Sequence, residues 1–501
     1  MPMSHPLIQK IFQWKIQITL VILFLVSIFL RTYLLSENLF FGPEQGIDFM
    51  AVREIVENRN ITLIGAKTDI DGIFHGPIYY YTTSIPFFIS SGDPLFIAYF
   101  LIVLNSLSIF FVYILSRELF NKSTGIISAI LLTVSFGAIV YARWLSTHPL
   151  VFPLSLLFFY FITRFLKKKE KFLIPAGVLA GLLGQAEFLN ILFVGTILVC
   201  LIIRFHNIFF KTSKMILTIS VFLYISFTWG NFFLFDVKNN WLILKNVQEL
   251  AFGDSGYYIS FVSLLKMSAI KSNIIIQDFL AKSFGWGVSI LFLISLVVLY
   301  MKNKFNMAAS VLTIWLFVPV FVLLVLRHEV LEQYFVLSVC AIVIVVAYFI
   351  SEIYKNQKYL GVFFLIVLIG ANMIVWKKAL PINLHMFFQN PQPQFLYKDQ
   401  LNAIRLIRKD AQGEKFSIQA YTIPYWSQQG WEYLFWYDGS GDINTMPVSG
   451  ADKLFVITQP DIGNPKFQQK WLKETVSAWG KEVNKHKVGN LTVREIETNE
   501  K

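Results

Sequence analysis

Long apolar segments recur along the chain and are separated by short polar connections. Each is close to the roughly 20 residues that a helix needs to cross a bilayer. Nine such segments can be delimited: 16–34, 95–116, 124–142, 149–166, 215–235, 284–301, 306–326, 335–352 and 359–376. A further stretch, 172–204, is too long for one span, and the sequence GLLGQAEFLN (Gly181–Asn190) divides it into two short helices. The pattern therefore predicts a polytopic α-helical membrane protein with about eleven spans.

The composition agrees with this class. The chain has 501 residues, of which 55% are hydrophobic and 15% charged, whereas soluble proteins carry about 25% charged residues. Cys200 and Cys340 both lie in apolar runs, so neither a disulfide framework nor a zinc spacing is expected. The first apolar run lacks a small-residue cleavage site and continues into Arg31, so we expect a retained helix, not a cleaved signal peptide.

The basic residues predict an orientation. The net charge is +12, but Lys and Arg gather in short connections such as Arg164–Lys171 and Arg204–Lys214. Such clusters mark the cytoplasmic side of a membrane protein, so no nucleic-acid partner is expected. The outer side then receives the longer connections: 35–94, Tyr141–His148, the apex around Gln185, 236–283, Arg327–Tyr334, and the chain from Lys377 onwards. We expect an integral protein of the plasma membrane with these parts extracytoplasmic.

The C-terminal segment differs from the rest in composition. KFSIQAY (Lys415–Tyr421) and KLFVITQ (Lys453–Gln459) have the pattern of strands, and YKDQLNAIRLIRKDA (Tyr397–Ala411) that of an amphipathic helix. We therefore predict two domains. Residues 1–376 would form the transmembrane domain, including the first external loop 35–94, and residues 377–501 a small α/β domain outside the membrane.

The first external loop contains a helix whose acids do not follow its apolar pattern. A helix from Pro43 to Asn58 would place five apolar side chains on one face: Ile47, Ala51, Val52, Ile55 and Val56. The opposite face would carry Arg53, Glu54 and Glu57. Glu44 and Asp48 lie one turn apart on the apolar side.

These two acids differ in how easily they are explained. Glu44 suits the first turn of a helix, where the dipole favours an acid. Asp48 is harder to explain, because an ionised carboxylate on an apolar face costs several kcal/mol unless it is paired or hydrogen-bonded. We interpret the helix as lying along the outer membrane surface with its acids pointing into a cavity. Burial there would raise a carboxyl pKa and prepare a general base.

Other candidate residues lie in the remaining outer connections. They are His75, Tyr79 and Tyr80 in the first loop, Arg143 and His148 in the next connection, Glu187 beside Gln185, and Arg327 and His328 with Glu329 or Glu332 as internal partners. Each has a simpler structural explanation, such as an aromatic belt, a snorkelling anchor or a solvated ion pair. As a set they combine carboxylates for proton transfer, cations for phosphate and aromatic rings for sugar, so we treat them as candidate substrate-binding residues.

Two motifs carry a resemblance to a known family. PEQGIDFMAVREIV (Pro43–Val56) followed by LIGAKTDIDGIFHGPIYYY (Leu63–Tyr81) resembles the first external loop of lipid-linked-sugar glycosyltransferases with the C-type (GT-C) membrane fold. The nearest group is family 39, which includes protein mannosyltransferases and aminoarabinose transferases. Glu44-Gln45 takes the position of the acidic pair, Val52-Arg53-Glu54 that of the helical stretch, and His75-Gly76-Pro77 that of the turn.

The resemblance implies an inverting transfer from a sugar on a polyprenyl phosphate to an acceptor hydroxyl on a glycan, glycolipid or protein. A first-loop carboxylate would be the base, and Arg327 and His328, with Arg143 behind them, would stabilise the leaving phosphate. The leading acid of the family is typically Asp, so Glu44 is a departure. We expect Glu44 to be the base by position, with Asp48 as the alternative.

The resemblance implies no nucleotide sugar, no cofactor and generally no tightly held metal, although Glu44, Asp48 and His75 could share a divalent cation. The alternative function is a transporter or flippase of lipid-linked saccharides. It would need ionisable residues within the spans near the midplane, and the spans are almost free of them. A non-catalytic membrane scaffold would leave the acids on the apolar face unexplained.

Overall fold

The computed structural model describes residues 6–68, 70–252, 259–304, 306–326, 330–379, 395–423 and 428–498. The chain forms two compact units. The helical unit comprises Met1–Tyr33, Thr62–Tyr79 and Phe100–Lys377, and the mixed unit comprises Leu34–Ile61, Tyr80–Tyr99 and Lys378–Lys501.

The helical unit consists of helices, most of which correspond to the predicted apolar segments. They are α1 (Pro6–Thr32), α6 (Ser108–Leu119), α7 (Lys122–Val134), α8 (Phe136–Ala142), α9 (His148–Leu166), α10 (Leu173–Ala186), α11 (Phe188–Arg204), α12 (His206–Lys211), α13 (Lys214–Lys238), α14 (Leu242–Phe252), α15 (Phe261–Leu280), α16 (Trp286–Asn303), α17 (Met307–Leu326), α18 (Val339–Asn356) and α19 (Lys358–Ala379). Helix α5 (Pro94–Ser106) continues into this unit from the mixed one. The polytopic helical fold is confirmed.

The number of spans stays a prediction. Within the described residues, eight helical stretches are long and apolar enough to cross a membrane, and the pair α7–α8, bent by 61°, would be a ninth. The predicted break in 172–204 is confirmed, since α10 ends at Ala186 and α11 begins at Phe188. Eleven spans are reached only if these two shorter helices are counted as well.

The bend between α7 and α8 leaves backbone groups that other helices satisfy. Arg31 of α1 is buried and donates to the carbonyls of Leu132 and Thr133 at the end of α7. The side-chain oxygen of Asn372 accepts the backbone N–H of Phe136 at 2.9 Å. A helix end surrounded by apolar material needs such partners, because no water is there to replace them.

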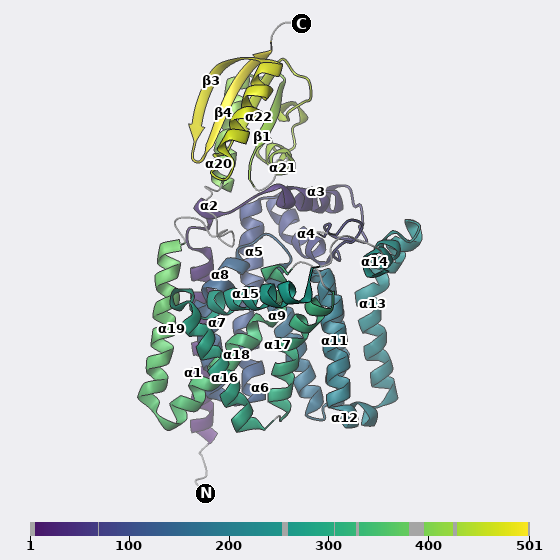
Figure 1. The fold of residues 1–501 in the computed structure, drawn as a ribbon, viewed down its shortest axis with the longest axis vertical. Helices are drawn as coiled ribbons and strands as arrows, with labels where there is room; N and C mark the ends of the chain where they lie inside the picture. The colour runs from purple at the N-terminus through teal and green to yellow at the C-terminus, as the bar shows by residue number, and fades with distance from the viewer. Residues whose placement is uncertain are drawn as a thin grey trace. The chain divides into compact units, whose positions relative to one another are not determined.

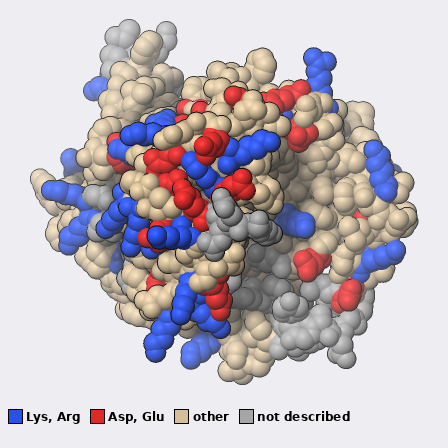
Figure 2. Space-filling model, turned by 90° about the horizontal axis from the view of Figure 1, so that it is seen from above, with Lys and Arg blue, Asp and Glu red and all other residues tan. Residues whose placement is uncertain are grey.

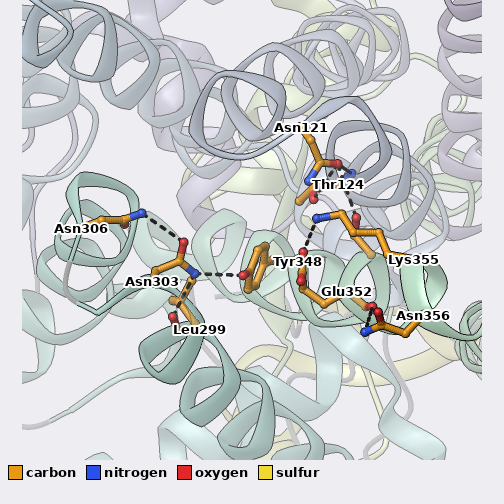
Figure 3. Close-up of polar contacts among 10 residues, drawn as sticks. Asn121, Thr124, Leu299, Asn303, Asn306, Tyr348, Glu352, Lys355 and Asn356 are labelled. Atoms are coloured by element: carbon orange, nitrogen blue, oxygen red, sulfur yellow. Dashed lines mark hydrogen bonds and ion pairs between the residues drawn. The ribbon is translucent and has the colours of Figure 1, made fainter. Parts of the chain in front are cut away.

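Polar side chains also connect the helix ends that carry basic residues (Figure 3). Asn303 of α16 donates to the hydroxyl of Tyr348 on α18 at 3.0 Å, and Asn306 donates to Asn303. Ser351 of α18 donates to Asn121 at the start of α7 at 3.4 Å. These bonds fix three helices against one another at one end of the bundle.

Residues 236–283, expected as a connection, contain helices α14 and α15. Figure 1 shows α15 running across the axis that α11, α13 and α19 follow. The segment was not recognised as helical because its apolar residues are interrupted by Lys266, Lys271 and Asp278, which shorten the apolar runs.

The mixed unit contains the C-terminal α/β fold. Its strands are β1 (Phe416–Tyr421), β2 (Lys453–Thr458), β3 (Gly480–Val488) and β4 (Leu491–Thr498), in the order β1-β2-β4-β3. The β1–β2 pair is parallel and the other two pairs are antiparallel. Helices α20 (Tyr397–Ala411), α21 (Gln429–Asp438) and α22 (Pro465–Trp479) accompany the sheet. The predicted helix and both predicted strands are confirmed.

The sheet has a compact apolar core. Leu454, Val456 and Ile496 are buried beneath α22, whose Trp471 and Val476 pack against them. Figure 2 shows Lys and Arg side chains interspersed with Asp and Glu on the face seen from above. On that face the positive net charge of the chain is therefore not gathered in a single-sign patch.

The mixed unit also includes most of the first external loop. Helices α2 (Leu35–Asn38) and α3 (Pro43–Glu57) and most of α4 (Ile78–Ser90) belong to it. The sequence assigned the whole loop 35–94 to the 1–376 domain, whereas the structure groups 34–61 and 80–99 with residues 378–501. The physical reason is that α3 packs directly on α21.

Candidate functional site

Helix α3 begins where the sequence predicted, at Pro43. The side-chain oxygen of Gln45 accepts the backbone N–H of Gly42 at 3.0 Å, which caps the helix start. The predicted inward face is wrong in part, because Ile47 is 48% exposed. The helix is rotated so that Phe49 and Val52 are fully buried, since Phe49 packs on aromatic rings that local periodicity does not reveal.

The two acids of α3 lie in different environments. Glu44 is exposed, whereas the Asp48 side chain is buried, with 8% of its surface accessible. The hydroxyl of Tyr80 on α4 donates to Asp48 Oδ1 at 2.9 Å. Burial raises the pKa of Asp48 to about 7; the Tyr80 hydrogen bond opposes this rise, and the charge of Glu44 adds to it. Burial and the neighbouring Asp48 also raise the pKa of Tyr80, which therefore stays a hydrogen-bond donor.

His75 lies in a short hairpin of the helical unit. Its backbone N–H donates to the carbonyl of Ala66 at 2.9 Å, and its carbonyl accepts the N–H of Gly65 at 2.8 Å. Its ring Nδ1 accepts the backbone N–H of Phe188 at 3.3 Å and lies 3.5 Å from a carboxylate oxygen of Glu187. Two predicted site residues that are far apart in sequence, His75 and Glu187, thus meet at the break between α10 and α11.

Gly76 allows this meeting. Its backbone N–H donates to the carbonyl of Gln185 at 2.9 Å, and a side-chain carbon added at Gly76 would collide with the side chain and the Cα of Gln185. The Gln185 amide in turn donates to the carbonyls of Phe227 and Thr228 on α13. Gln185 therefore connects the hairpin to helix α13 at the break between α10 and α11.

His148 begins helix α9 and is 9% exposed. Its ring stacks on that of Trp144, with centroids 4.6 Å apart and planes 5° from parallel. Ser146 Oγ lies 2.9 Å from His148 Nδ1 and accepts the backbone N–H of His148 at 3.3 Å. Within the described part of the chain, the buried Nε2 of His148 has no hydrogen-bond partner.

Arg143 and Tyr79 are both buried. Arg143 Nη1 donates to the carbonyl of Arg31 at 3.0 Å and to that of Tyr33 at 2.8 Å, at the end of α1. Arg143 is therefore not an exposed anchor at the membrane surface, which was the simpler structural explanation for it. It supplies a cationic donor to carbonyls that a helix end leaves unsatisfied.

Two candidates cannot be placed. Arg327 and His328, together with Glu329, lie outside the described residues. Glu332, considered as their partner, accepts a hydrogen bond from Lys271 of α15 at 2.9 Å. A buried acid of α15, Asp278, was missed by the sequence reasoning, although an acid inside the apolar run IIIQDFL is the same signal that singled out Asp48. Burial raises the pKa of Asp278, and Lys282 opposes the rise.

No three side chains of His, Cys, Asp or Glu gather as metal ligands in the parts of the chain that the structure describes. The shared cation considered for Glu44, Asp48 and His75 therefore gains no support. The described residues thus include two acids on α3 of the mixed unit, the exposed Glu44 and the buried Asp48. In the helical unit they include two histidines at helix ends, His75 beside Glu187 and His148 at the start of α9.

Comparisons with known proteins agree with this geometry. The family model "dolichyl-phosphate-mannose-protein mannosyltransferase" matches residues 74–230, which begin at the His75 hairpin and run through α9 to α13. No curated protein sequence matches the chain significantly.

The solved structures that are similar over nearly the whole chain include two with a bound lipid phosphate. ArnT from Cupriavidus metallidurans, bound to undecaprenyl phosphate, is 11% identical with a TM-score of 0.60, covering 95% of this chain and 97% of that one. The oligosaccharyltransferase AglB from Archaeoglobus fulgidus, in complex with an inhibitory peptide and a dolichol-phosphate, is 12% identical with a TM-score of 0.52, covering 96% and 74%. The chain therefore has the fold of the C-type membrane glycosyltransferases and carries the protein mannosyltransferase sequence pattern over residues 74–230, which supports a role in glycosyl transfer.

Proposed function

We propose that this protein transfers a sugar from a polyprenyl-phosphate donor to an acceptor hydroxyl on the outer face of the membrane, with inversion, and that Glu44 is the general base. The observation that carries the proposal is the acid pair of α3, in which Glu44 is exposed and Asp48 is buried against Tyr80. A base must touch the proton that it removes, and Glu44 is the accessible member of the pair. The lipid phosphates bound to ArnT and AglB support a donor of this class.

The reaction would be a single displacement. Glu44 takes the proton of the acceptor hydroxyl as its oxygen attacks the anomeric carbon. The bond between that carbon and the phosphate oxygen breaks, and polyprenyl phosphate leaves with the bonding electrons. Attack from the face opposite the leaving group inverts the anomeric configuration. Because burial raises the pKa of Asp48 to about 7, Asp48 is partly protonated near neutral pH, which reduces the repulsion between two acids one helical turn apart.

The imidazoles of the helical unit are suited to oxygen ligands. The N–H of Phe188 donates to His75 Nδ1, so the neutral ring carries its proton on Nε2 and donates there. Ser146 Oγ lies 2.9 Å from His148 Nδ1, so in the tautomer with the ring proton on Nε2 the Ser146 hydroxyl donates to Nδ1. We propose that these two Nε2–H groups donate to oxygens of the donor, with Arg327 and His328 stabilising the phosphate charge.

The function is tested in proteoliposomes with the full-length protein. A panel of polyprenyl-phosphate sugars with radiolabelled sugar is supplied with candidate acceptors, and nucleotide sugars serve as negative controls. We expect one lipid-linked sugar to be transferred and free polyprenyl phosphate to accumulate in equal amount. Movement of the intact lipid-linked sugar across the bilayer, without transfer, would instead identify a flippase and overturn the proposal.

The proposed orientation has its own test. In a variant without Cys200 and Cys340, a cysteine at Ser440 should react with a membrane-impermeant maleimide added outside intact cells, and one at Lys168 should react only after permeabilisation. The reverse pattern would contradict the orientation.

A further inference from the structure

A contact between two glycines joins the acid-bearing helix α3 to helix α21. A side-chain carbon added at Gly46 would lie 2.5 Å from the carbonyl oxygen of Gln429 and from the nitrogen of Gly430. One added at Gly430 would lie 2.8 Å from the carbonyl oxygen of Gly42. Side-chain carbons do not approach backbone atoms this closely, so the helices can cross here only because both positions are glycine. Gly46 falls between the two acids in sequence, so the crossing fixes the backbone that carries them.

Tyr433 of α21 contacts both helices that supply the Asp48–Tyr80 hydrogen bond. Its fully buried ring lies 5.3 Å from that of Phe49, which follows Asp48 in α3, at an interplanar angle of 84°. It lies 6.5 Å from Phe87, two turns beyond Tyr80 on α4. Packing of this kind holds α3 and α4 at a fixed separation.

The Tyr433 hydroxyl adds a polar anchor, since it donates to the carbonyl of Gly92 just beyond α4 at 2.5 Å. One turn further along α21, the Trp436 ring stacks on Phe87 at 6.1 Å and 15°. The guanidinium of Arg53 on α3 lies 4.5 Å above the same Trp436 ring. Two consecutive turns of α21 thus connect α3 with α4.

We infer that α21 is a positioning element for the first-loop acids: through Gly430, Tyr433 and Trp436 it holds α3 against α4, so that Asp48 stays buried against Tyr80 and Glu44 stays exposed. The C-terminal segment is then part of the catalytic apparatus and not only a module for binding a partner. The catalytic consequence rests on the proposed function, whereas the positioning itself does not.

Asp48 provides a readout of this positioning that does not depend on catalysis. The titratable groups that act on it are Tyr80 from α4 and Glu44 from α3, and α21 acts on it through packing. Loss of the α3–α21 contact would admit water to Asp48, and its pKa would fall towards the ordinary carboxyl value of about 4. A change that only lowered the amount of folded protein would leave this pKa where it is.

Gly430→Ala is the test variant and Gly463→Ala is its control. Gly463 lies in the same unit, and a side-chain carbon added there would come no closer than 3.5 Å to any described heavy atom beyond its chain neighbours, which is ordinary van der Waals contact. The thermal unfolding midpoint of each full-length protein is measured from pH 4 to pH 9, with and without Asp48→Asn. The pH at which the difference between the two curves levels off gives the folded-state pKa of Asp48, here called its titration midpoint.

We expect the titration midpoint of Asp48 to be near pH 7 in the parent protein and after Gly463→Ala. After Gly430→Ala we expect it to be lower by about one pH unit or more. If Gly430→Ala does not fold, Tyr433→Phe replaces it, since it keeps the ring and loses only the bond to Gly92; a smaller shift in the same direction is expected. An unchanged midpoint in the variant that folds would overturn the positioning role.

Turnover in the proteoliposome assay completes the test. We expect Gly430→Ala to lower the turnover number on the order of tenfold to a hundredfold, and Gly463→Ala to leave it unchanged. A shifted midpoint in a protein that transfers no sugar would uphold the positioning role and refute the proposed function. Full turnover together with an unshifted midpoint would refute the positioning role alone.

Discussion

The two units hold their candidate site residues by different means. In the helical unit, hydrogen bonds to backbone groups fix the candidate side chains. The N–H of Phe188 donates to His75, and Arg143 donates to carbonyls at the end of α1. In the mixed unit, Asp48 is held by the side chain of Tyr80 and by the packing that keeps water away from it.

The difference matters because backbone amides and carbonyls do not titrate. The arrangement around His75 is set by the break between helices α10 and α11, where the backbone N–H of Phe188 donates to the ring. The state of Asp48 depends on burial, which packing far along the chain can change. Sensitivity to remote substitutions is thus expected to concentrate in the mixed unit, and the variants below test that contrast.

The largest expected effect is on catalysis by the exposed acid. Glu44→Gln removes the proton acceptor and keeps the size of the side chain, so we expect the initial rate of sugar transfer to fall by about a thousandfold. Glu54→Gln is the control, since Glu54 is also exposed on α3 and should be dispensable. Equal activity of the Glu44→Gln variant and the parent would show that another group takes the proton, and Asp48→Asn would then be the variant to compare.

Asp48→Asn should change stability in a pH-dependent manner. The pKa of Asp48 is raised to about 7 in the folded state, so the folded protein binds the proton more tightly than the unfolded chain does. The stability that Asp48 contributes is therefore complete at low pH and is lost as the pH rises from about 4 to about 7. Relative to the parent, the Asn variant should accordingly be more stable at pH 8 than at pH 5 by about 3 kcal/mol at most, because the loss between pH 5 and pH 7 covers two pH units at about 1.4 kcal/mol each.

The measurement is the thermal midpoint of purified protein at the two pH values. A variant whose midpoint differs from the parent by the same amount at pH 5 and at pH 8 would show that Asp48 is ionised in the folded protein throughout this range.

A smaller effect is expected in the helical unit. Gly76→Ala would force the His75 hairpin away from Gln185, at a cost of about 1–3 kcal/mol of stability. Gly370→Ala in α19 is the control, because no atom lies within 4 Å of the added carbon. The measurement is the loss in thermal midpoint relative to the parent. A Gly76→Ala variant as stable as the parent would show that the hairpin accommodates the added carbon without moving away from Gln185.

The same contrast explains what could be predicted from the sequence. The apolar helices, the break before Phe188 and helix α20 can all be predicted from the sequence, because each depends on hydropathy or periodicity within one segment. Asp48 was recognised as unusual for the same reason: an acid on an apolar face is a local signal.

What could not be predicted depends on contacts between distant segments. The rotation of α3 that exposes Ile47 follows from the packing of Phe49 on Tyr433, nearly four hundred residues later. The close contact between Gly46 and Gly430 cannot be predicted from the sequence around either glycine. It contributes to the packing that groups the first loop with the C-terminal segment. The partners of His75 and Arg143 are backbone groups, whose positions only the fold determines.

The central claim is tested most directly by the stereochemistry and stoichiometry of a single turnover. Purified protein in proteoliposomes is mixed with a polyprenyl-phosphate sugar of known anomeric configuration and an excess of the acceptor identified in the panel. We predict one inverted glycoside formed for each polyprenyl phosphate released, and neither product with Glu44→Gln. A product of retained configuration, or the same products from the Glu44→Gln protein, would contradict a single displacement that uses the exposed acid of α3.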